Sequence, residues 1–208
     1  MRRKRERSGY VVPMPGEALE VLVTSRAQWR AWLAEHHATS GPIWLVTYKK
    51  ASGKPRVTYD EIVEEALCFG WIDSRSGAVD DERSKLWLTK RRRGSEWSRL
   101  NKQRVQRLSA EGLIAPPGLQ VIEAAQADGS WSALDEVEDG VVPDDLAEAL
   151  VAMPPASTEW EAFSASTRRG ILQWIASAKR PETRAKRVAE TAELASRGLK
   201  ANQWPRQG

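Results

Sequence analysis

The chain is poor in the residues that most often bind metals or act as catalytic nucleophiles and bases. Its 208 residues include one cysteine, Cys68, and two adjacent histidines, His36 and His37. A single cysteine excludes an intrachain disulfide and a Cys-rich zinc site, and its apolar neighbours favour a buried, unactivated thiol. Adjacent histidines diverge on a helix, and at a predicted helix end they favour a role at the carboxyl-end dipole. We therefore predict no catalytic residue, no metal and no cofactor.

Long apolar runs are also missing. No segment approaches the roughly 18 apolar residues of a membrane-spanning helix. Near the N-terminus the apolar residues 10–12 stop at Pro13, which is too short a run for a secretory signal. Together with the single cysteine, these absences predict a cytoplasmic protein without a membrane span. A glycine-rich phosphate-binding loop is absent as well.

The excess of positive charge is small and confined to one end. The chain has 32 basic and 28 acidic residues, a net charge of +4, and residues 1–10 alone hold five basic residues and one acidic residue. The remainder is therefore neutral. We predict a disordered basic tail over residues 1–16, and the balance argues against a nucleic-acid partner. Weak binding to nucleic acid or to an anionic surface through the basic segments stays as an alternative.

Tryptophan is the residue that this chain has in excess. Ten Trp residues outnumber the three Tyr and two Phe residues together. Each buried Trp removes about 150 to 250 Å² from water, which contributes about 4 to 6 kcal/mol before conformational entropy is counted. Core packing is therefore the default interpretation of each tryptophan.

Caps and apolar periodicity predict an α+β domain over residues 17–134. Strands are expected at residues 17–24, 43–50, 69–73 and 85–90, and helices at residues 24–37, 59–68, 96–111 and 117–127. Thr58 and Glu61 form a capping box at the start of the second helix, whose Glu64 and Glu65 should face solvent. Ser95 is the expected cap of the third helix.

A change of composition predicts a second domain over residues 135–204. Residues 135–161 hold nine acidic residues and no Lys or Arg, and Gly and Pro interrupt them. Short helices are expected from residues 143, 157, 166 and 181 onward. The predicted fold class is therefore α+β, with a small antiparallel sheet flanked by helices, followed by a helical C-terminal unit.

Residues 66–102 combine tryptophans with polar groups and suggest a ligand site. Asp73 ends an apolar strand, where an unpaired charge is costly to bury, so it should meet a cation or a helix-start donor. The candidate ligand-binding residues are Lys50, Trp71, Asp73, Arg91, Ser95, Trp97 and Asn101. They could bind an amide-bearing or anionic ligand. They could also form an ion pair and a cap that hold the sheet to the helix at 96–111, which is the interpretation that we favour.

A second candidate site lies in the C-terminal domain. The candidate anion-binding residues there are Lys179, Arg180, Arg184 and Arg187. They could meet phosphate, a lipid headgroup or an acidic protein. Because the acidic block at 135–161 is close to matched in charge, we favour pairing inside the molecule.

Several strings of residues carry a family resemblance. They include Trp44-Leu45, Lys49-Lys50, residues 59–61, the string A-L-C-F-G-W-I-D at 66–73, Ser95, Trp97-Ser98, Asn101-Lys102, Gly112, residues 178–184 and residues 186–187. They resemble the YdeI/OmpD-associated family, also called bacteriocin-protection proteins, over about residues 24–200. Such proteins usually carry a Pro-Arg-Lys-Pro run where this chain has residues 90–93, so only Arg91 matches there. The resemblance implies protection against antimicrobial peptides or envelope stress in bacteria, without an established reaction.

By this resemblance we predict a non-catalytic stress or bacteriocin-protection protein that acts by binding a small molecule or a peptide. The competing hypothesis is a small-molecule-binding protein or enzyme that uses a cleft around Asp73 and Trp97. A concave pocket lined by the polar side chains of residues 73, 91, 95 and 101 would favour that alternative.

Overall fold

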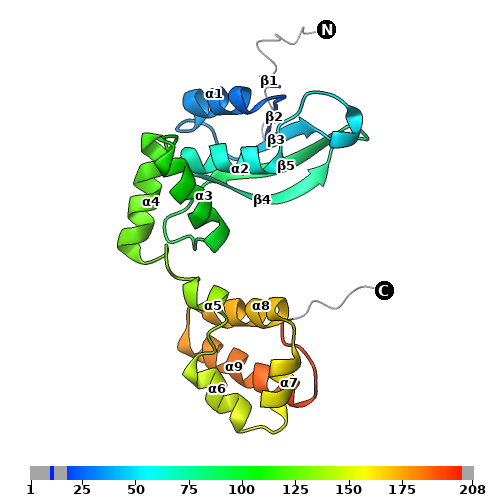
Figure 1. Ribbon diagram of the computed structural model, residues 1–208, viewed down its shortest axis with the longest axis vertical. Helices are drawn as coiled ribbons and strands as arrows, with labels where there is room; N and C mark the ends of the chain where they lie inside the picture. The colour runs from blue at the N-terminus through cyan, green and yellow to red at the C-terminus, as the bar shows by residue number, and fades with distance from the viewer. Residues whose placement is uncertain (1–9, 12–17, 203–208) are drawn as a thin grey trace. The chain divides into compact units, whose positions relative to one another are not determined.

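The computed structural model describes residues 10–11 and 18–202 and divides the chain into two compact units, Met1–Trp131 and Ser132–Gly208 (Figure 1). The predicted basic tail at 1–16 lies outside the described residues, except that Tyr10–Val11 forms strand β1. The α+β fold class, with a helix-flanked sheet and a helical C-terminal region, is confirmed.

The sheet of the first unit has the strand order β1-β2-β3-β5-β4. Its other strands are β2 (Leu19–Leu22), β3 (Ile43–Tyr48), β4 (Trp71–Ala78) and β5 (Arg83–Lys90). The sheet is mixed, which differs from the all-antiparallel sheet that the sequence suggested, because β2 and β3 run parallel. Helix α1 (Arg26–His36) connects these two strands and returns the chain to the same end before β3 begins.

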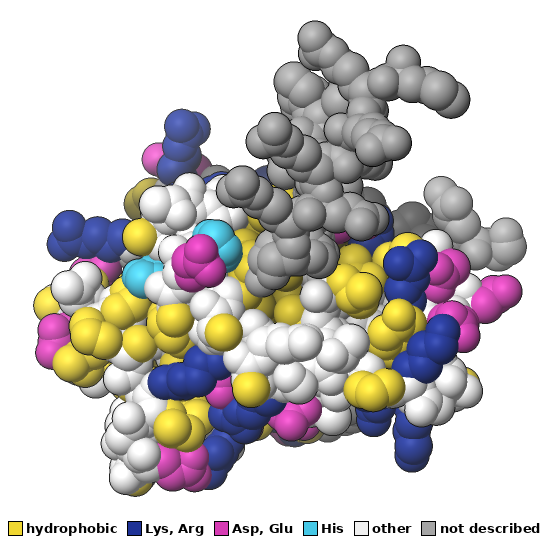
Figure 2. Space-filling model, turned by 90° about the horizontal axis from the view of Figure 1, so that it is seen from above, with side chains coloured by type: hydrophobic (Ala, Val, Ile, Leu, Met, Phe, Trp, Pro, Cys, Tyr) yellow, Lys and Arg dark blue, Asp and Glu magenta, His cyan; other side chains and the backbone are white. Residues whose placement is uncertain are grey.

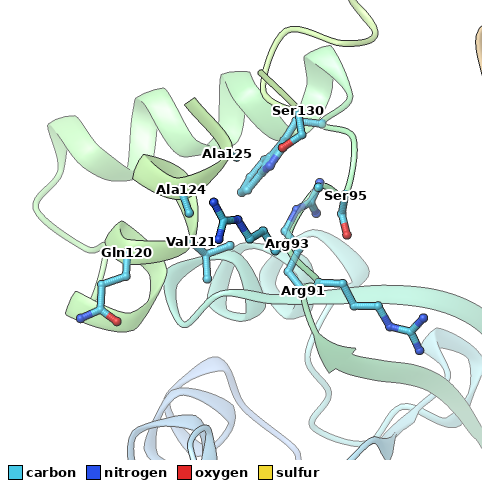
Figure 3. A pocket seen from close by; sticks show the side chains of 11 residues that line it. Arg91, Arg93, Ser95, Gln120, Val121, Ala124, Ala125 and Ser130 are labelled. Carbon is cyan, nitrogen blue, oxygen red and sulfur yellow. The ribbon is translucent and has the colours of Figure 1, made fainter. Parts of the chain in front are cut away.

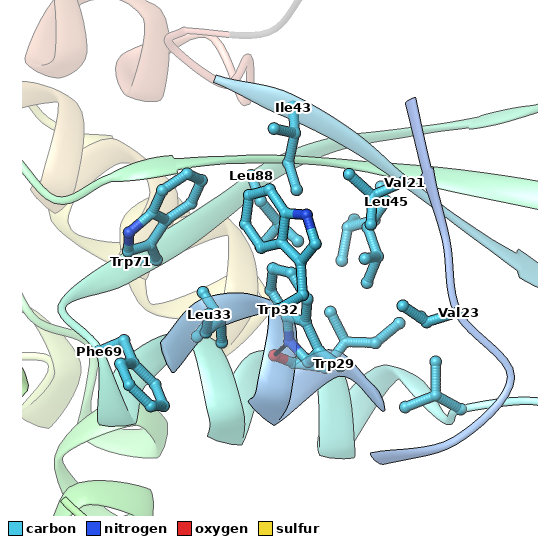
Figure 4. Close-up of a cluster of buried hydrophobic side chains, with 14 of the residues drawn as sticks. Val21, Val23, Trp29, Trp32, Leu33, Ile43, Leu45, Phe69, Trp71 and Leu88 are labelled. Carbon is cyan, nitrogen blue, oxygen red and sulfur yellow. Dashed lines mark hydrogen bonds between the residues drawn. The ribbon is translucent and has the colours of Figure 1, made fainter. Parts of the chain in front are cut away.

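Tryptophans and aliphatic side chains fill the space between the sheet and two helices, α1 and α2 (Tyr59–Cys68) (Figure 4). Trp29 and Trp32 stack with ring centroids 5.4 Å apart, and Trp32 meets Trp71 edge-on at 5.9 Å. The Trp29 indole donates a hydrogen bond to the Ile62 carbonyl at 3.0 Å, which ties α1 to α2. Cys68 is fully buried in this core, as expected, and burial raises the pKa of its thiol to about 11.

Glu64 and Glu65 are buried, and the prediction that they face solvent is wrong. Glu65 accepts hydrogen bonds from Arg26 Nε at 2.6 Å and from Arg30 Nη1 at 2.7 Å, both on α1. Glu64 is bound by Arg26 Nη1 at 3.0 Å and by Arg107 of helix α3 (Arg99–Ala110). Helical periodicity could not show this, since the arginines come from segments distant in sequence.

The outer face of the sheet carries a cross-strand tryptophan pair. Trp44 and Trp87 are directly opposite each other on β3 and β5, with ring centroids 4.9 Å apart. The Arg75 guanidinium lies 5.2 Å from the Trp44 ring centroid and 4.8 Å from that of Trp87, and Lys85 Nζ lies 4.7 Å from Trp44. The two cations therefore shield indole surface that the helices on the opposite face do not cover.

Helices α3 and α4 (Pro116–Asp128) complete the first unit beside α2. The cap of α3 is Ser98, whose hydroxyl accepts from the Asn101 amide, and not Ser95 as predicted. Ser95 instead ends a turn that begins at Arg92, where its backbone amide donates a hydrogen bond to the Arg92 carbonyl at 3.1 Å. The capping box of Thr58 and Glu61 at the start of α2 is confirmed.

The second unit is a helical bundle around its own core of buried apolar side chains. Its helices are α5 (Asp135–Asp139), α6 (Asp144–Val151), α7 (Ala156–Ala162), α8 (Ala165–Ala176) and α9 (Pro181–Ser196). Leu146, Trp160 and Ala192 are at most 1 % exposed and connect α6, α7 and α9. The short helix α5 was not expected from the sequence.

Substituting Glu65→Gln should lower the free energy of unfolding by about 2 to 3 kcal/mol, because it leaves Arg26 and Arg30 without their shared carboxylate. The loss stays below that of a fully buried pair, since these arginine side chains are 33 % and 36 % exposed and can be solvated. Urea unfolding followed by circular dichroism measures the change.

The control for this variant is Glu35→Gln, whose carboxylate side chain is 77 % exposed. It should change the free energy of unfolding by less than about 0.5 kcal/mol. Equal effects of the two variants would show that the buried network does not hold the helices together.

Candidate functional site

The structure divides the predicted ligand site among several places in the first unit. Trp71 is in the core, 1 % exposed, with its indole donating to the His37 carbonyl at 3.3 Å. Asp73 accepts a hydrogen bond from the Tyr59 hydroxyl at 2.9 Å, and Asn101 accepts one from Arg104 at 3.0 Å. Asp73 and Asn101 are therefore each bound by a neighbouring side chain of the same unit.

Arg91, Ser95 and Trp97 do come together, in a pocket of about 230 Å³ (Figure 3). The pocket lies between the segment that follows β5 and helix α4. Its lining consists of Arg91, Arg92, Arg93, Gly94, Ser95, Trp97, Gln120, Val121, Ala124, Ala125 and Ser130. We call this the Arg91 pocket. Its lining includes three arginines and no acidic side chain.

Arg91 is buried, and no carboxylate of the described residues forms an ion pair with it. The residue is 7 % exposed, and its guanidinium carbon lies 3.7 Å from the Trp97 ring centroid. Nη2 donates to the Glu96 carbonyl at 2.6 Å, whereas Nε and Nη1 have no hydrogen-bond partner among the described residues. Burial lowers the pKa of Arg91 to about 10 against the opposing attraction of Asp73, so the group stays charged at neutral pH.

Local backbone structure explains how this arginine is held. Strand β5 ends at Lys90, and the Arg91 amide donates to the Gly70 carbonyl at 2.9 Å, which fixes the chain as it leaves the sheet. Gly94 then takes a φ of +72°, in the left-handed region that favours glycine, and turns the chain toward Trp97. Trp97 packs on Trp131 with ring centroids 4.9 Å apart.

Asp128 anchors the other side of this turn. Its carboxylate accepts from the Ser130 amide at 3.0 Å and lies 3.7 Å from Arg93 Nε. Hydrogen bonds from Ser130, followed by the attraction of Arg93, hold the pKa of Asp128 below its usual range. The turn after β5 and the end of α4 are therefore joined by polar contacts around the pocket.

The lining favours binding over acid-base chemistry. A buried cation in an uncharged surrounding is costly, and an entering anion recovers that cost through charge-assisted hydrogen bonds. Ser95 and Ser130 line the pocket, but its lining contains no His, Asp, Glu or Cys that could take a proton from them.

The α4 side of the pocket was missed in the sequence. Gln120, Val121, Ala124 and Ala125 all lie on the helix predicted at 117–127. Their spacing at i, i+1, i+4 and i+5 indicates one helix face, and the small alanines indicate that something approaches it closely. No pattern in the chain links that face to Arg91.

Lys50 lies elsewhere, in the 3₁₀ turn Lys50–Ser52 beside a second pocket of about 330 Å³. Lys49, Arg56 and Lys85 line the same pocket. Lys85 is paired with Glu20 at 3.3 Å, and Lys49 Nζ donates to the Asp80 carbonyl at 2.7 Å. Two of these four cations therefore already have acceptors within the first unit.

The candidate anion-binding residues of the second unit are largely used inside it. Arg184 makes two hydrogen bonds to Asp145, at 2.7 and 2.9 Å, and Arg187 donates to Ser177 Oγ at 3.0 Å and lies over the Trp174 ring. The pairing between the acidic and basic blocks that we favoured thus forms at Arg184. Lys179 and Arg180 are exposed at the start of α9.

Comparison with known proteins matches two parts of the chain to two different family models. Residues 139–198 match the model of the family described as bacteriocin-protection, YdeI or OmpD-associated. The resemblance to this family is confirmed over that segment. Residues 21–121, which contain the Arg91 pocket except for its last lining residues, match the model of a domain of unknown function, DUF8412. No curated relative and no solved structure matches the chain significantly.

Charged side chains are visible on the surface of the molecule. On the face shown in Figure 2, basic and acidic side chains are interspersed, without a continuous basic area.

Within residues 18–202, no helix has the length and apolarity needed to cross a membrane, and no group of three His, Cys, Asp or Glu side chains could hold a metal ion.

Gly118 sets the distance between α4 and α2, so Gly118→Ala should disrupt the pocket wall. A Cβ atom there would lie 2.2 Å from the Cys68 carbonyl oxygen, a backbone atom that cannot move alone. We expect the free energy of unfolding to fall by more than about 3 kcal/mol. Differential scanning calorimetry measures the shift.

Gly170 provides the matched control, because it also lies within a helix but has open space where a Cβ would stand. Gly170→Ala should stabilise the protein by about 0.5 to 1 kcal/mol, since alanine favours the helix. If both variants shifted the transition in the same direction, close approach at Gly118 would not be what positions α4.

Proposed function

We propose that this chain protects bacterial cells against bacteriocins or related antimicrobial peptides, that it acts by binding, and that the Arg91 pocket is the binding site. The observation that carries the proposal is the buried Arg91 guanidinium, with two nitrogens that have no hydrogen-bond partner among the described residues. A buried polar group without a partner costs free energy that packing alone does not recover. A ligand with an anionic group would supply the missing acceptors.

The match of residues 139–198 to the bacteriocin-protection family supports the protective role. The lining of the pocket supports binding, because its polar groups are cationic or neutral donors suited to hold an anion. The volume of the pocket, about 230 Å³, is smaller than the roughly 300 Å³ that is the lower end of the usual range for ligand pockets. Only a small ligand, or one group of a larger ligand, fits inside.

An unpaired buried charge points to function because it does not benefit the fold. Replacing buried charged groups by apolar side chains of similar size is often neutral or stabilising. Arg91 gains a stacking contact with Trp97 and one hydrogen bond to Glu96, but burial disfavours its charge. A residue that costs stability without a ligand is expected where a ligand is bound.

The test is Arg91→Met, which keeps the side-chain length and the contact with Trp97 but removes the charge. We expect the free energy of unfolding to stay unchanged or to rise by about 1 kcal/mol. Survival of cells that express the chain under bacteriocin challenge should fall to the level of cells without it. Thermal unfolding and survival are measured on the same variant.

Arg169→Met is the matched control, since Arg169 is an exposed arginine on α8 of the second unit. It should leave both survival and unfolding unchanged. Arg91→Lys serves as a second test, because it keeps a cation but loses the planar set of donors, and protection should fall at least partly. Full protection by a folded Arg91→Met protein would refute the proposal.

A further inference from the structure

We infer that the group held in the Arg91 pocket is the C-terminal carboxylate of a peptide. This inference rests on the proposed function and names the ligand of the same site. It follows from four properties of the pocket: its charge, the geometry of its free donors, its apolar walls and its size.

The charge of the pocket favours a group with a single negative charge. Arg91 is the one arginine of the lining that is buried, whereas Arg92 and Arg93 are exposed, where water screens them. A carboxylate balances one buried guanidinium. A dianionic phosphate would leave a net negative charge in a surrounding that disfavours any unbalanced charge. The pocket thus suits a carboxylate better than a phosphate.

The geometry of the free donors calls for more than one acceptor. The N–H bonds of Nε and Nη1 diverge in the plane of the guanidinium, and Nη2, which lies beside both in turn, donates to the Glu96 carbonyl. One oxygen atom cannot satisfy both. A peptide end offers the two carboxylate oxygens and, one residue earlier, a backbone carbonyl.

The walls beside the guanidinium are apolar. Val121, Ala124 and Ala125 of α4 line the pocket together with Trp97. This combination of a cation and small apolar side chains matches a terminal residue with a small apolar side chain. Because the volume of about 230 Å³ is small, only that residue enters, and the preceding residues pass the exposed Arg92 and Arg93 on the way out.

The experiment compares two peptides that differ only at their last group. The probes are N-acetylated Ala-Ala-Val with a free carboxylate and the same peptide with a C-terminal amide, titrated into the full chain by calorimetry. We expect the free acid to bind at least tenfold more tightly than the amide. Arg91→Met should remove this difference, whereas Arg169→Met should keep it. Inorganic phosphate is titrated in parallel.

Each outcome decides the question. Equal affinity for the acid and the amide, or no binding of either, overturns the inference even if Arg91→Met abolishes protection, in which case the proposed function stands with another ligand. Tighter binding of phosphate than of the free acid overturns it in favour of a phosphate-bearing ligand. If Arg91→Met instead retains full protection while the acid binds preferentially, the carboxylate site is real and the proposed function fails.

Discussion

The arrangement of the first unit depends on two carboxylates of helix α2. Glu65 is held by two arginines of α1, and Glu64 by an arginine of α1 and one of α3, so that one helix fixes the positions of two others. Both residues are buried, Glu65 almost completely. Their desolvation is offset only when all the partners are in place, which makes the packing of these helices mutually dependent. Helix α4 then seats against α2 through the glycine that touches Cys68.

Within the same unit, the surroundings raise the pKa of some arginines and lower that of another. Arg26 and Arg30 lie beside buried carboxylates, and hydrogen bonds to Glu65 raise the pKa of each against the effect of burial. Arg91 has no ion-pair partner among the residues that the structure describes, and burial lowers its pKa. The buried carboxylates of α2 are bound by other arginines, and the attraction of Asp73 only partly opposes the effect of burial on Arg91. The contrast distinguishes arginines that pair with buried carboxylates from Arg91, whose guanidinium lies on the Trp97 ring.

Tryptophan serves three different purposes in this fold. Trp29, Trp32 and Trp71 form the centre of the main core. Trp44 and Trp87 cover each other on the outer face of the sheet under two cations. Trp97 provides the aromatic wall on which the Arg91 guanidinium lies, and is itself braced by Trp131. The same side chain is useful in each place because it combines a large apolar surface with a face that attracts cations.

Local chemistry in the sequence was enough to place most elements of the first unit. The capping box at Thr58, the apolar stripe of α1 and the alternating strands β3 and β5 depend on neighbours within a few residues, so their patterns can be read directly. The family resemblance, confirmed at residues 139–198, likewise came from strings of consecutive residues.

The tertiary structure decided what distant segments do to one another. It buried Glu64 and Glu65 by bringing arginines from two other helices, made β2 and β3 parallel, and bound Asp73 to the Tyr59 hydroxyl. It also brought residues of α4 and Arg91 to the same pocket, which no spacing in the chain indicates. Whether a charged side chain is solvated, paired or available to a ligand depends on groups that come into contact only after folding. The local patterns of one sequence do not specify those contacts.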